Sequence, residues 1–302
     1  MSFISFLYKT ELQSIYGCLE ISGEEAEKYL QGQLTSDIKF FNFPENFLTA
    51  QLTAHCNAKG RVVILGYLIR PQANRYIYFI PKDILETAYQ SLSRFILRAK
   101  VKISKKNYPN ITVLFSETPG LIQKLIQKLM QPHKPADYFS TATNHFITTS
   151  IAFGLPSSEV SPPENQNYQE AHCITDCITD VCNTTPEHFL AYLARHQIPW
   201  LGAQTQGEFL PDELKLNQHP NAICLTKGCY IGQEIIARMH YRGLSGEHSK
   251  NKISYQISQD LNLKPKDVFS SSIENTPLPS NTIILCQVVF NQMNHCLVLS
   301  KQ

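Results

Sequence analysis

The feature that most constrains this chain is a cysteine set between two glycines, in the stretch Lys227-Gly-Cys-Tyr-Ile-Gly-Gln-Glu234. Gly228 and Gly232 allow positive φ or a close backbone approach, which most residues resist. The next residues predict an amphipathic helix, because apolar side chains recur there at helical spacing. These apolar residues are Ile235, Ile236 and Met239. The pattern therefore predicts a glycine-rich loop that leads into a helix and holds Cys229 just ahead of it.

The surroundings of Cys229 favour a reactive thiol. A helix N-terminus carries a partial positive charge that stabilises a thiolate, and Lys227 and Arg238 are expected to add to it. The alternative interpretation is a buried structural cysteine in a glycine turn, because free cysteine is among the most buried residue types. Both interpretations stay open from the sequence.

The same stretch resembles the Lys-Gly-Cys-Tyr-x-Gly-Gln-Glu signature of the YgfZ family, a branch of the glycine-cleavage T-protein-like proteins linked to iron–sulfur assembly. Three further segments resemble that family. They are Gln31-Gly-Gln-Leu-Thr-Ser-Asp37, Ala54-His-Cys-Asn-Ala-Lys-Gly-Arg61 and Gly207-Glu-Phe-Leu-Pro-Asp-Glu-Leu214. The resemblance extends from about Cys18 to Arg242, which is most of the chain.

The resemblance implies a folate-binding accessory protein that supports assembly or repair of iron–sulfur enzymes, including radical enzymes that modify tRNA. It implies tetrahydrofolate or another reduced folate as cofactor, and iron–sulfur enzymes or cluster-assembly proteins as partners. Cys229 would be the functional thiol. The other signature residues would hold it in place, namely Lys227, Gly228, Tyr230, Gly232, Gln233 and Glu234.

Two aromatic residues are candidates for folate contacts. Tyr16 and Phe189 match places at which bacterial YgfZ proteins can carry tryptophans that line the folate pocket. A pterin needs an apolar slot and a flat aromatic ring to stack against, and both residues retain that type. The alternative is that both are ordinary core aromatics.

The expected fold class is α+β, a T-protein-like multi-lobed fold with mainly antiparallel sheets. Residues 62–69 and 75–80 predict paired strands, and a helix follows with Ile84, Ala88, Leu92 and Phe95 on its buried face. The folate-binding region would span 1–243, with lobes of roughly 1–50 plus 154–243, and 51–153. Residues 244–302 carry strand-like runs between turns and predict a small C-terminal β-barrel.

Composition narrows the class of protein. The 302 residues are 43% hydrophobic and 17% charged, with a formal net charge of +2, which favours neither direct nucleic-acid binding nor membrane insertion. The nine cysteines are odd in number and lack any C-x-x-C pair, so we expect reduced thiols and a cytoplasmic location. We also expect a monomer. Cys173, Cys177 and Cys182 are spaced unlike zinc ligands, and no metal is expected on them.

Three rival functions stay open. The first is a folate-dependent aminomethyltransferase, although that family lacks the Cys229 signature. The second is a thiol enzyme in which Cys229 is the nucleophile and His55 or His240 approaches as the base. The third is a binding module with an inert Cys229. The nucleotide-binding glycine motifs and the serine nucleophile elbow are absent from the sequence, so neither chemistry is indicated.

Overall fold

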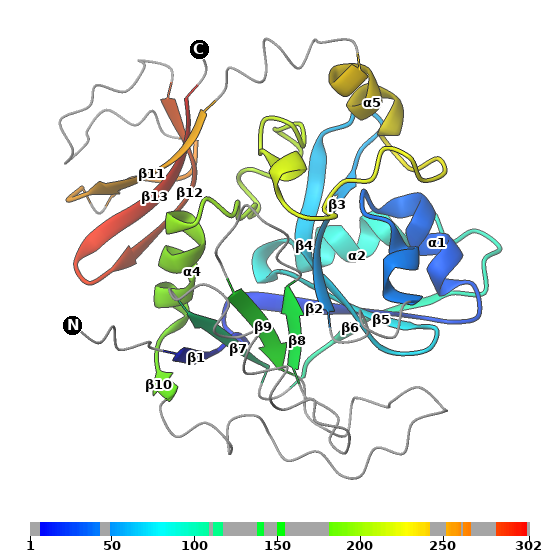
Figure 1. The fold of residues 1–302 in the computed structure, drawn as a ribbon, viewed down its shortest axis with the longest axis horizontal. Coiled ribbons are helices and arrows are strands. Elements are labelled where there is room, and N and C mark those ends of the chain that lie inside the picture. The colour runs from blue at the N-terminus through cyan, green and yellow to red at the C-terminus, as the bar shows by residue number, and fades with distance from the viewer. Residues whose placement is uncertain are drawn as a thin grey trace.

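The computed structural model describes residues 7–42, 49–108, 111–116, 138–141, 150–154, 181–241, 252–260, 262–266 and 282–300. In these residues the chain forms a long, mainly antiparallel sheet and a smaller sheet near the C-terminus (Figure 1). Helices pack against both sheets, so the predicted α+β class is confirmed.

The long sheet has the strand order β10-β1-β7-β9-β8-β3-β4-β5-β2-β6. All its neighbours pair antiparallel except β1 with β10 and β3 with β8. The strands are β1 (Leu7–Glu11), β2 (Tyr16–Ser22), β3 (Thr49–Cys56), β4 (Val62–Gln72), β5 (Arg75–Pro81), β6 (Lys102–Lys106), β7 (Thr112–Ser116), β8 (Tyr138–Thr141), β9 (Ser150–Gly154) and β10 (Val181–Asn183).

The hairpin β4–β5 confirms the two paired strands that the sequence predicts. Gln72 pairs with Arg75 across a two-residue turn in which Asn74 has φ 56°, a left-handed conformation that Asn tolerates well. Strand β2 then pairs with β5 on one side and with β6 on the other. The sheet therefore joins residues 16–22 to residues 75–81, across the two predicted lobes, and the lobe boundaries stay a prediction.

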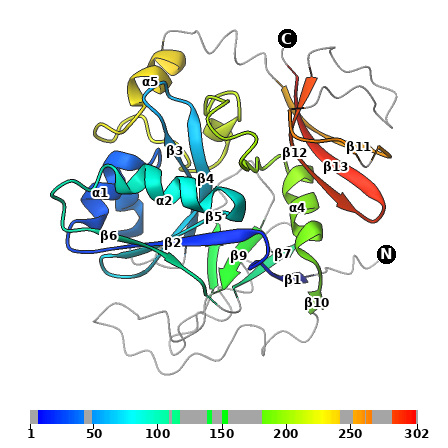
Figure 2. The same ribbon diagram turned by 180° about the vertical axis from the view of Figure 1, so that it is seen from behind.

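Two helices, α1 (Ala26–Gln33) and α2 (Leu85–Ser93), cover one face of strands β2–β6. In Figure 2, α2 crosses in front of these strands. The helices bury Leu30 and Leu92 against Leu19 and Ile21 of β2, and all four side chains are fully buried. Burying one such side chain stabilises the fold by about 2 kcal/mol. The 3-10 turn Lys82–Ile84 leads into α2, and another, Ile38–Asn42, follows α1.

The expected position of Phe95 is wrong. Helix α2 ends at Ser93, so the helical periodicity that buries Ile84, Ala88 and Leu92 does not continue to Phe95. Its side chain is 42% exposed.

Helix α4 (Pro186–Arg195) lies between the long sheet and the C-terminal sheet (Figures 1 and 2). Its start follows from the sequence, because the Thr185 side chain accepts a hydrogen bond from His188 N and Pro186 occupies the first turn. The C-terminal sheet has the order β11-β13-β12, from β11 (Lys252–Ser258), β12 (Thr282–Phe290) and β13 (Met293–Ser300). Its closure into a barrel stays a prediction.

The segment 196–232 has little regular structure apart from the 3-10 turn Leu216–Gln218, and it ends at α5 (Gln233–Tyr241). Its apolar residues, such as Leu201, Phe209 and Leu214, are buried in the main core. Within the described part of the chain, no helix is long and apolar enough to cross a membrane.

Candidate functional site

Residues 227–232 alternate between the core and the surface. Lys227 and Tyr230 are buried, with 9% and 6% exposure, whereas Gly228 and Cys229 are exposed. Helix α5 begins at Gln233, so three residues separate Cys229 from the helix. The loop therefore presents the thiol outward while its neighbours anchor it from within.

The Lys227 ammonium is the inner anchor of this loop. Its Nζ donates to three backbone carbonyls, at 2.8 Å to Gln31, 2.5 Å to Leu34 and 2.7 Å to Ser36. These carbonyls lie in and after the last turn of α1, where the helix dipole is negative. The ammonium also lies 4.7 Å from the centre of the Tyr230 ring. All three of its N–H bonds are thus used inside the fold.

This geometry gives Lys227 a structural role. Its hydrogen bonds hold the segment 31–36, and the effect of its charge on Cys229 stays a prediction. Burial lowers the pKa of Lys227 to about 8, although the nearby carboxyl of Asp37 and thiol of Cys224 act to raise it. Lys227 is therefore still mainly protonated at pH 7, and its structural role requires that form.

Thr35 joins the neighbouring segments around the same point. Its hydroxyl donates to Ala222 O at 2.7 Å and accepts from Ala54 N at 3.0 Å. Its carbonyl accepts from Cys224 N at 2.8 Å. The sequence did not single out Thr35, although it lies inside a family-like segment. Through Thr35 and Lys227, segment 31–37 contacts both strand β3 and the Cys229 loop.

Gly232 packs against the turn that follows β3. Its φ is +83°, and a Cβ added there would lie 2.7 Å from Asn57 O and 3.0 Å from Gly60 Cα. The turn itself is fixed by Asn57, whose Oδ1 accepts from the backbone N of Lys59 and of Arg61. Gly232 therefore has to be glycine for both conformational and spatial reasons.

Gly228 differs from Gly232. It has no positive φ, and a Cβ added there would meet nothing within 4 Å. The positive φ that the sequence allows at both glycines is thus found at Gly232 and not at Gly228. The fourth family-like segment also joins this region, because Val62 N donates to Phe209 O and Gly207 N donates to Val62 O. All four segments meet around the Cys229 loop.

His55 is unavailable as a base in this conformation. Its ring is 1% exposed, with Nδ1 3.0 Å from Gln33 O and Nε2 3.1 Å from Ser91 Oγ. The carbonyl can only accept, so Nδ1 carries the hydrogen and Nε2 accepts from the serine. Burial lowers the pKa of His55, outweighing the hydrogen bond to Gln33 that raises it. The neutral imidazole ring therefore links β3 to α1 and α2 through its two hydrogen bonds.

Gln233 and Glu234 also hold positions away from the thiol. Gln233 Nε2 donates to Lys227 O at 3.4 Å, which closes the loop on itself. The Glu234 carboxylate pairs with Arg238 one helical turn later, at 2.5 Å and largely in solvent. Such an exposed pair adds only a few tenths of a kcal/mol to helix stability. Arg238, expected to act on Cys229, thus has Glu234 as its partner.

A cavity of about 190 Å³ lies between α5 and the segment that precedes the Cys229 loop. Its lining is mainly apolar, with one carboxylate, Asp212, and one imidazole, His240. The apolar lining is Leu210, Pro211, Ile223, Leu225, Ile236 and Met239. Ile236 and Met239 belong to the predicted apolar face of the helix, and part of that face therefore borders a cavity.

The two folate candidates lie side by side in the core, and their contact with folate stays a prediction. The ring centres of Tyr16 and Phe189 are 6.5 Å apart, and Trp200 packs edge-on to Tyr16 at 4.8 Å. Phe189 is 0% exposed and Tyr16 is 4% exposed, so in this conformation they contact the core and leave no room for a pterin between them. Trp200 is half-buried and offers the accessible ring. Its signal in the sequence was that it is the single tryptophan.

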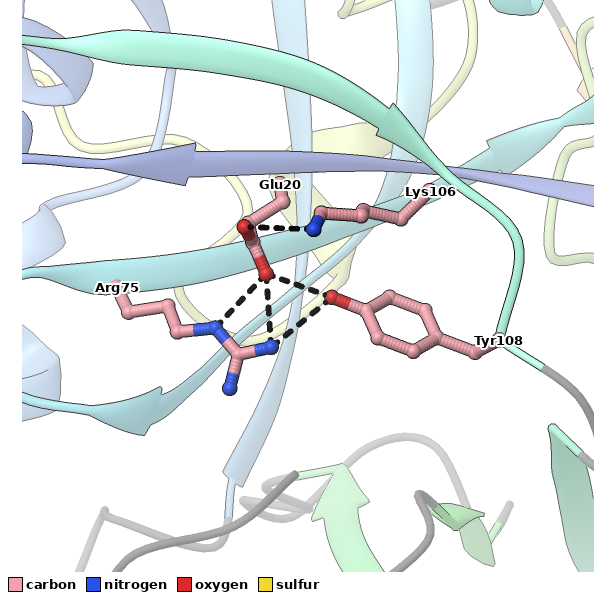
Figure 3. Close-up of polar contacts among 4 residues, drawn as sticks. All are labelled: Glu20, Arg75, Lys106 and Tyr108. Atoms are coloured by element: carbon pink, nitrogen blue, oxygen red, sulfur yellow. Dashed lines mark hydrogen bonds and ion pairs between the residues drawn. The ribbon is translucent and has the colours of Figure 1, made fainter. Parts of the chain in front are cut away.

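A second polar cluster lies on strands β2, β5 and β6 (Figure 3). Glu20 accepts from Arg75 at 2.7 Å and from Tyr108 at 2.8 Å, and Lys106 lies 3.6 Å away. Burial alone would raise the pKa of Glu20, but the hydrogen bonds from Tyr108 and Arg75 and the charges of Arg75 and Lys106 lower it. The carboxylate is fully paired, so this cluster stabilises the sheet edge.

His219 makes the neighbouring loop sensitive to acid. It is 9% exposed, and burial lowers its pKa to about 4 from 6.5. Between pH 4 and pH 6.5 the unfolded chain binds a proton on His219 that the folded protein does not bind. The stability that comes from a neutral His219 is therefore present above pH 6.5 and is lost as the pH falls toward 4. Between pH 7 and pH 5, wild type should lose about 2 kcal/mol more than His219→Leu. Urea unfolding of both proteins at the two pH values measures this difference, and equal losses would contradict it.

The cysteines in the described residues are all free thiols. Cys182, on β10, is half-buried, while Cys173 and Cys177 lie outside the described residues. Among the residues described, no group of three or more His, Cys, Asp or Glu side chains is placed to hold a metal ion.

Comparison of the sequence with known proteins gives a consistent set of relatives. The tRNA-modifying protein YgfZ of Colwellia psychrerythraea is 30% identical over 242 residues, covering 78% of this chain and 68% of the relative. YgfZ of Photorhabdus laumondii is 27% identical over 230 residues, covering 76% and 65%. An uncharacterized protein of Haemophilus influenzae is 31% identical over 228 residues, covering 76% and 67%. The matched region thus spans about two thirds of each relative.

Comparison of the fold gives the glycine cleavage system aminomethyltransferase T of Bartonella henselae, with a TM-score of 0.56 and 9% identity. The match covers 98% of this chain and 79% of that one, which confirms the predicted T-protein-like fold. No protein-family model matches the chain. With the Colwellia relative at 30% identity over most of this chain, and with its signature segments gathered at one site, the chain belongs to the YgfZ family.

Proposed function

We propose that the protein is a folate-binding accessory protein that supports assembly or repair of iron–sulfur enzymes, among them enzymes that modify tRNA. The YgfZ relatives are named tRNA-modifying proteins, and the fold is similar to that of a glycine cleavage system aminomethyltransferase. Cys229 is the functional centre in this proposal. The T-protein-like fold alone carries no activity, because fold and function are separable.

One observation carries the proposal. Cys229 is exposed, yet the residues on both sides of it are fixed, Lys227 by three carbonyls and Gly232 by contact with the turn 57–60. A thiol that only filled space would point inward, as Cys56 does at 0% exposure. A fixed and accessible thiol is suited to touch a sulfur species, a cluster or the thiol of a client.

The alternative function, in which Cys229 is a nucleophile activated by a histidine base, loses one of its two candidate bases. Both nitrogens of His55 are used in the core. His240 is exposed on α5, and its ring packs against Tyr241 at 5.0 Å. A one-carbon transferase is tested directly by turnover of formaldehyde or methylamine with tetrahydrofolate, and activity there would replace the accessory function.

For folate, Trp200 is the accessible ring of the aromatic cluster, and Tyr16 and Phe189 support it from behind. A pterin held on Trp200 would have an apolar surface backed by two further rings. The chain's own contribution would be to orient the pterin and exclude water from one of its faces.

Titration with tetrahydrofolate should quench the fluorescence of Trp200, which is the single tryptophan in the chain. Tyr16→Ala and Phe189→Ala should bind more weakly, because Tyr16 packs directly against Trp200 and Phe189 packs against Tyr16. Circular dichroism melts, with titration well below the melting temperature, separate lost binding from unfolding. Saturable binding that leaves the Trp200 signal unchanged would place folate elsewhere.

Cys229 should alkylate faster than the buried thiols near neutral pH. Cys229 is exposed, whereas burial raises the pKa of Cys56 to about 12 and also protects its sulfur. Cys229→Ala should change the free energy of unfolding by less than about 0.5 kcal/mol, as surface substitutions do. Residue-resolved mass spectrometry and urea unfolding check both statements. If Cys229 reacts only after the protein unfolds, it is a buried core residue and this prediction is wrong.

The decisive experiment is genetic. A bacterial strain lacking its own YgfZ is scored for tRNA thiomethylation and for the activity of an iron–sulfur enzyme. Wild type should restore both, and Cys229→Ala should restore neither although it folds normally. Cys182→Ala, which changes a half-buried thiol, is the matched control. If Cys229→Ala rescues the strain as well as wild type does, the proposal is wrong.

A further inference from the structure

The segment between α2 and the end of β6 is strongly basic, although the whole chain has a net charge of only +2. Residues 94–106 contain six Lys or Arg and no Asp or Glu. The six are Arg94, Arg98, Lys100, Lys102, Lys105 and Lys106. All six are exposed. The average over the chain therefore conceals a local concentration of positive charge.

Half of these charges already have carboxylate partners. Lys100 lies 2.7 Å from Glu24, Lys105 lies 2.6 Å from Glu86, and Lys106 lies 3.6 Å from Glu20 (Figure 3). Arg94, Arg98 and Lys102 have no acidic partner among the described residues. Three exposed cations thus stay available on one short segment.

Two exposed apolar side chains lie among these cations. Leu97 is 90% exposed and Phe95 is 42% exposed, whereas their neighbour Ile96 packs against the core. Leu97 also has φ 46°, a left-handed conformation that is uncommon for a bulky residue. Leu97 thus combines an unfavourable backbone conformation with a side chain that packs on almost nothing inside the fold. Such an outlier points to a role outside the monomer.

This surface contacts the strand that leads to the turn under Gly232. The Phe95 ring lies 6.2 Å from the ring of His55 on β3, and a Cβ added at Gly232 would lie 3.1 Å from Cβ of the next residue, Cys56. In Figures 1 and 2, the connection between α2 and β6 lies on the same edge of the molecule as the loop that leads into α5.

We propose that Phe95 and Leu97, with Arg94, Arg98 and Lys102 around them, form a docking patch for a protein that presents an apolar helix face flanked by carboxylates. The unpaired cations set the charge of the partner. An exposed aromatic, a leucine and arginines together are typical of an apolar interface centre with a charged rim. RNA would use Phe95 and the cations, but Leu97 has no ring on which a base can stack. The patch does not depend on the chemistry of Cys229.

The test uses the full-length protein and a fluorescent acidic amphipathic helical peptide, with Leu on one face and Glu on the other. We expect the peptide to bind wild type, and Leu97→Asn and Arg98→Glu each to weaken binding about tenfold or more. Asn adopts the left-handed conformation readily, so Leu97→Asn should keep or raise the melting temperature. Lys39→Glu and Val289→Asn, an exposed cation and an exposed apolar residue elsewhere, should bind like wild type.

The same variants are titrated with unmodified tRNA and with oligouridylate. If Arg98→Glu weakens RNA binding while Leu97→Asn has no effect on either probe, the patch is a nucleic-acid surface and the proposal is wrong. Absence of peptide binding to wild type at low salt overturns it as well. Loss of peptide binding in both patch variants with unchanged stability supports it.

Discussion

Replacing Gly232 by alanine should destabilise the protein by about 3 kcal/mol or more. Two terms add. A φ of +83° is strained for any residue with a Cβ, and that Cβ would lie 2.7 Å from Asn57 O and 3.0 Å from Gly60 Cα. Both neighbours are backbone atoms of a turn fixed by the Asn57 side chain, so neither can move cheaply. Urea unfolding measures the loss.

Gly228→Ala is the matched control for Gly232→Ala. It lies in the same loop, has no positive φ, and an added Cβ meets nothing within 4 Å. Its stability should be unchanged or higher by up to about 1 kcal/mol, because alanine restricts the unfolded chain. If the two variants unfold at the same urea concentration, the contact between the Cys229 loop and the turn 57–60 is absent in solution.

Lys227→Met should cost about 3 kcal/mol. Methionine keeps the apolar stem and its contact with Tyr230, but the carbonyls of Gln31, Leu34 and Ser36 then lose their donor. An unpaired buried acceptor costs about 1–3 kcal/mol. Relief from burying a charge offsets part of this, since burial lowers the pKa of Lys227 to about 8. The net effect is still a loss, measured as a shift in the urea midpoint.

Lys39→Met supplies the comparison for Lys227→Met, because Lys39 is exposed and follows the same segment. It should change stability by less than about 0.5 kcal/mol. Lys227→Met should also lower the activity of the protein in the rescue experiment, although Cys229 is still present. Wild-type stability together with full rescue would remove Lys227 from its anchoring role.

Local patterns predicted the elements that depend on local sequence. The strands β4 and β5 follow from apolar runs around a tight turn, and the start of α4 follows from Thr185 and Pro186. Phe95 shows the limit of periodicity, because the repeat fits a helix one turn longer than the chain forms.

The candidate site was predicted in part. The signature identified Cys229, and the structure places it in the open with fixed neighbours. From the sequence, Gly228 and Gly232 have the same predicted role. They differ in the structure because only Gly232 packs against the turn 57–60. The acceptors of Lys227 lie more than 190 residues away in the chain, with separations of 191 to 196. No local pattern encodes a contact of that range, and the same holds for β2 between β5 and β6.

The long separation between Lys227 and its carbonyls also affects when Cys229 takes its place. During synthesis the segment 31–36 emerges early, and its three carbonyls have no ammonium partner until Lys227 is made, 191 to 196 residues later. Closing so long a loop is an intrinsically slow, late event in folding. A nascent or truncated chain therefore exposes the Cys229 thiol before Lys227 and its three carbonyls have fixed the loop. Only a chain that has finished folding displays Cys229 to a client in a fixed position.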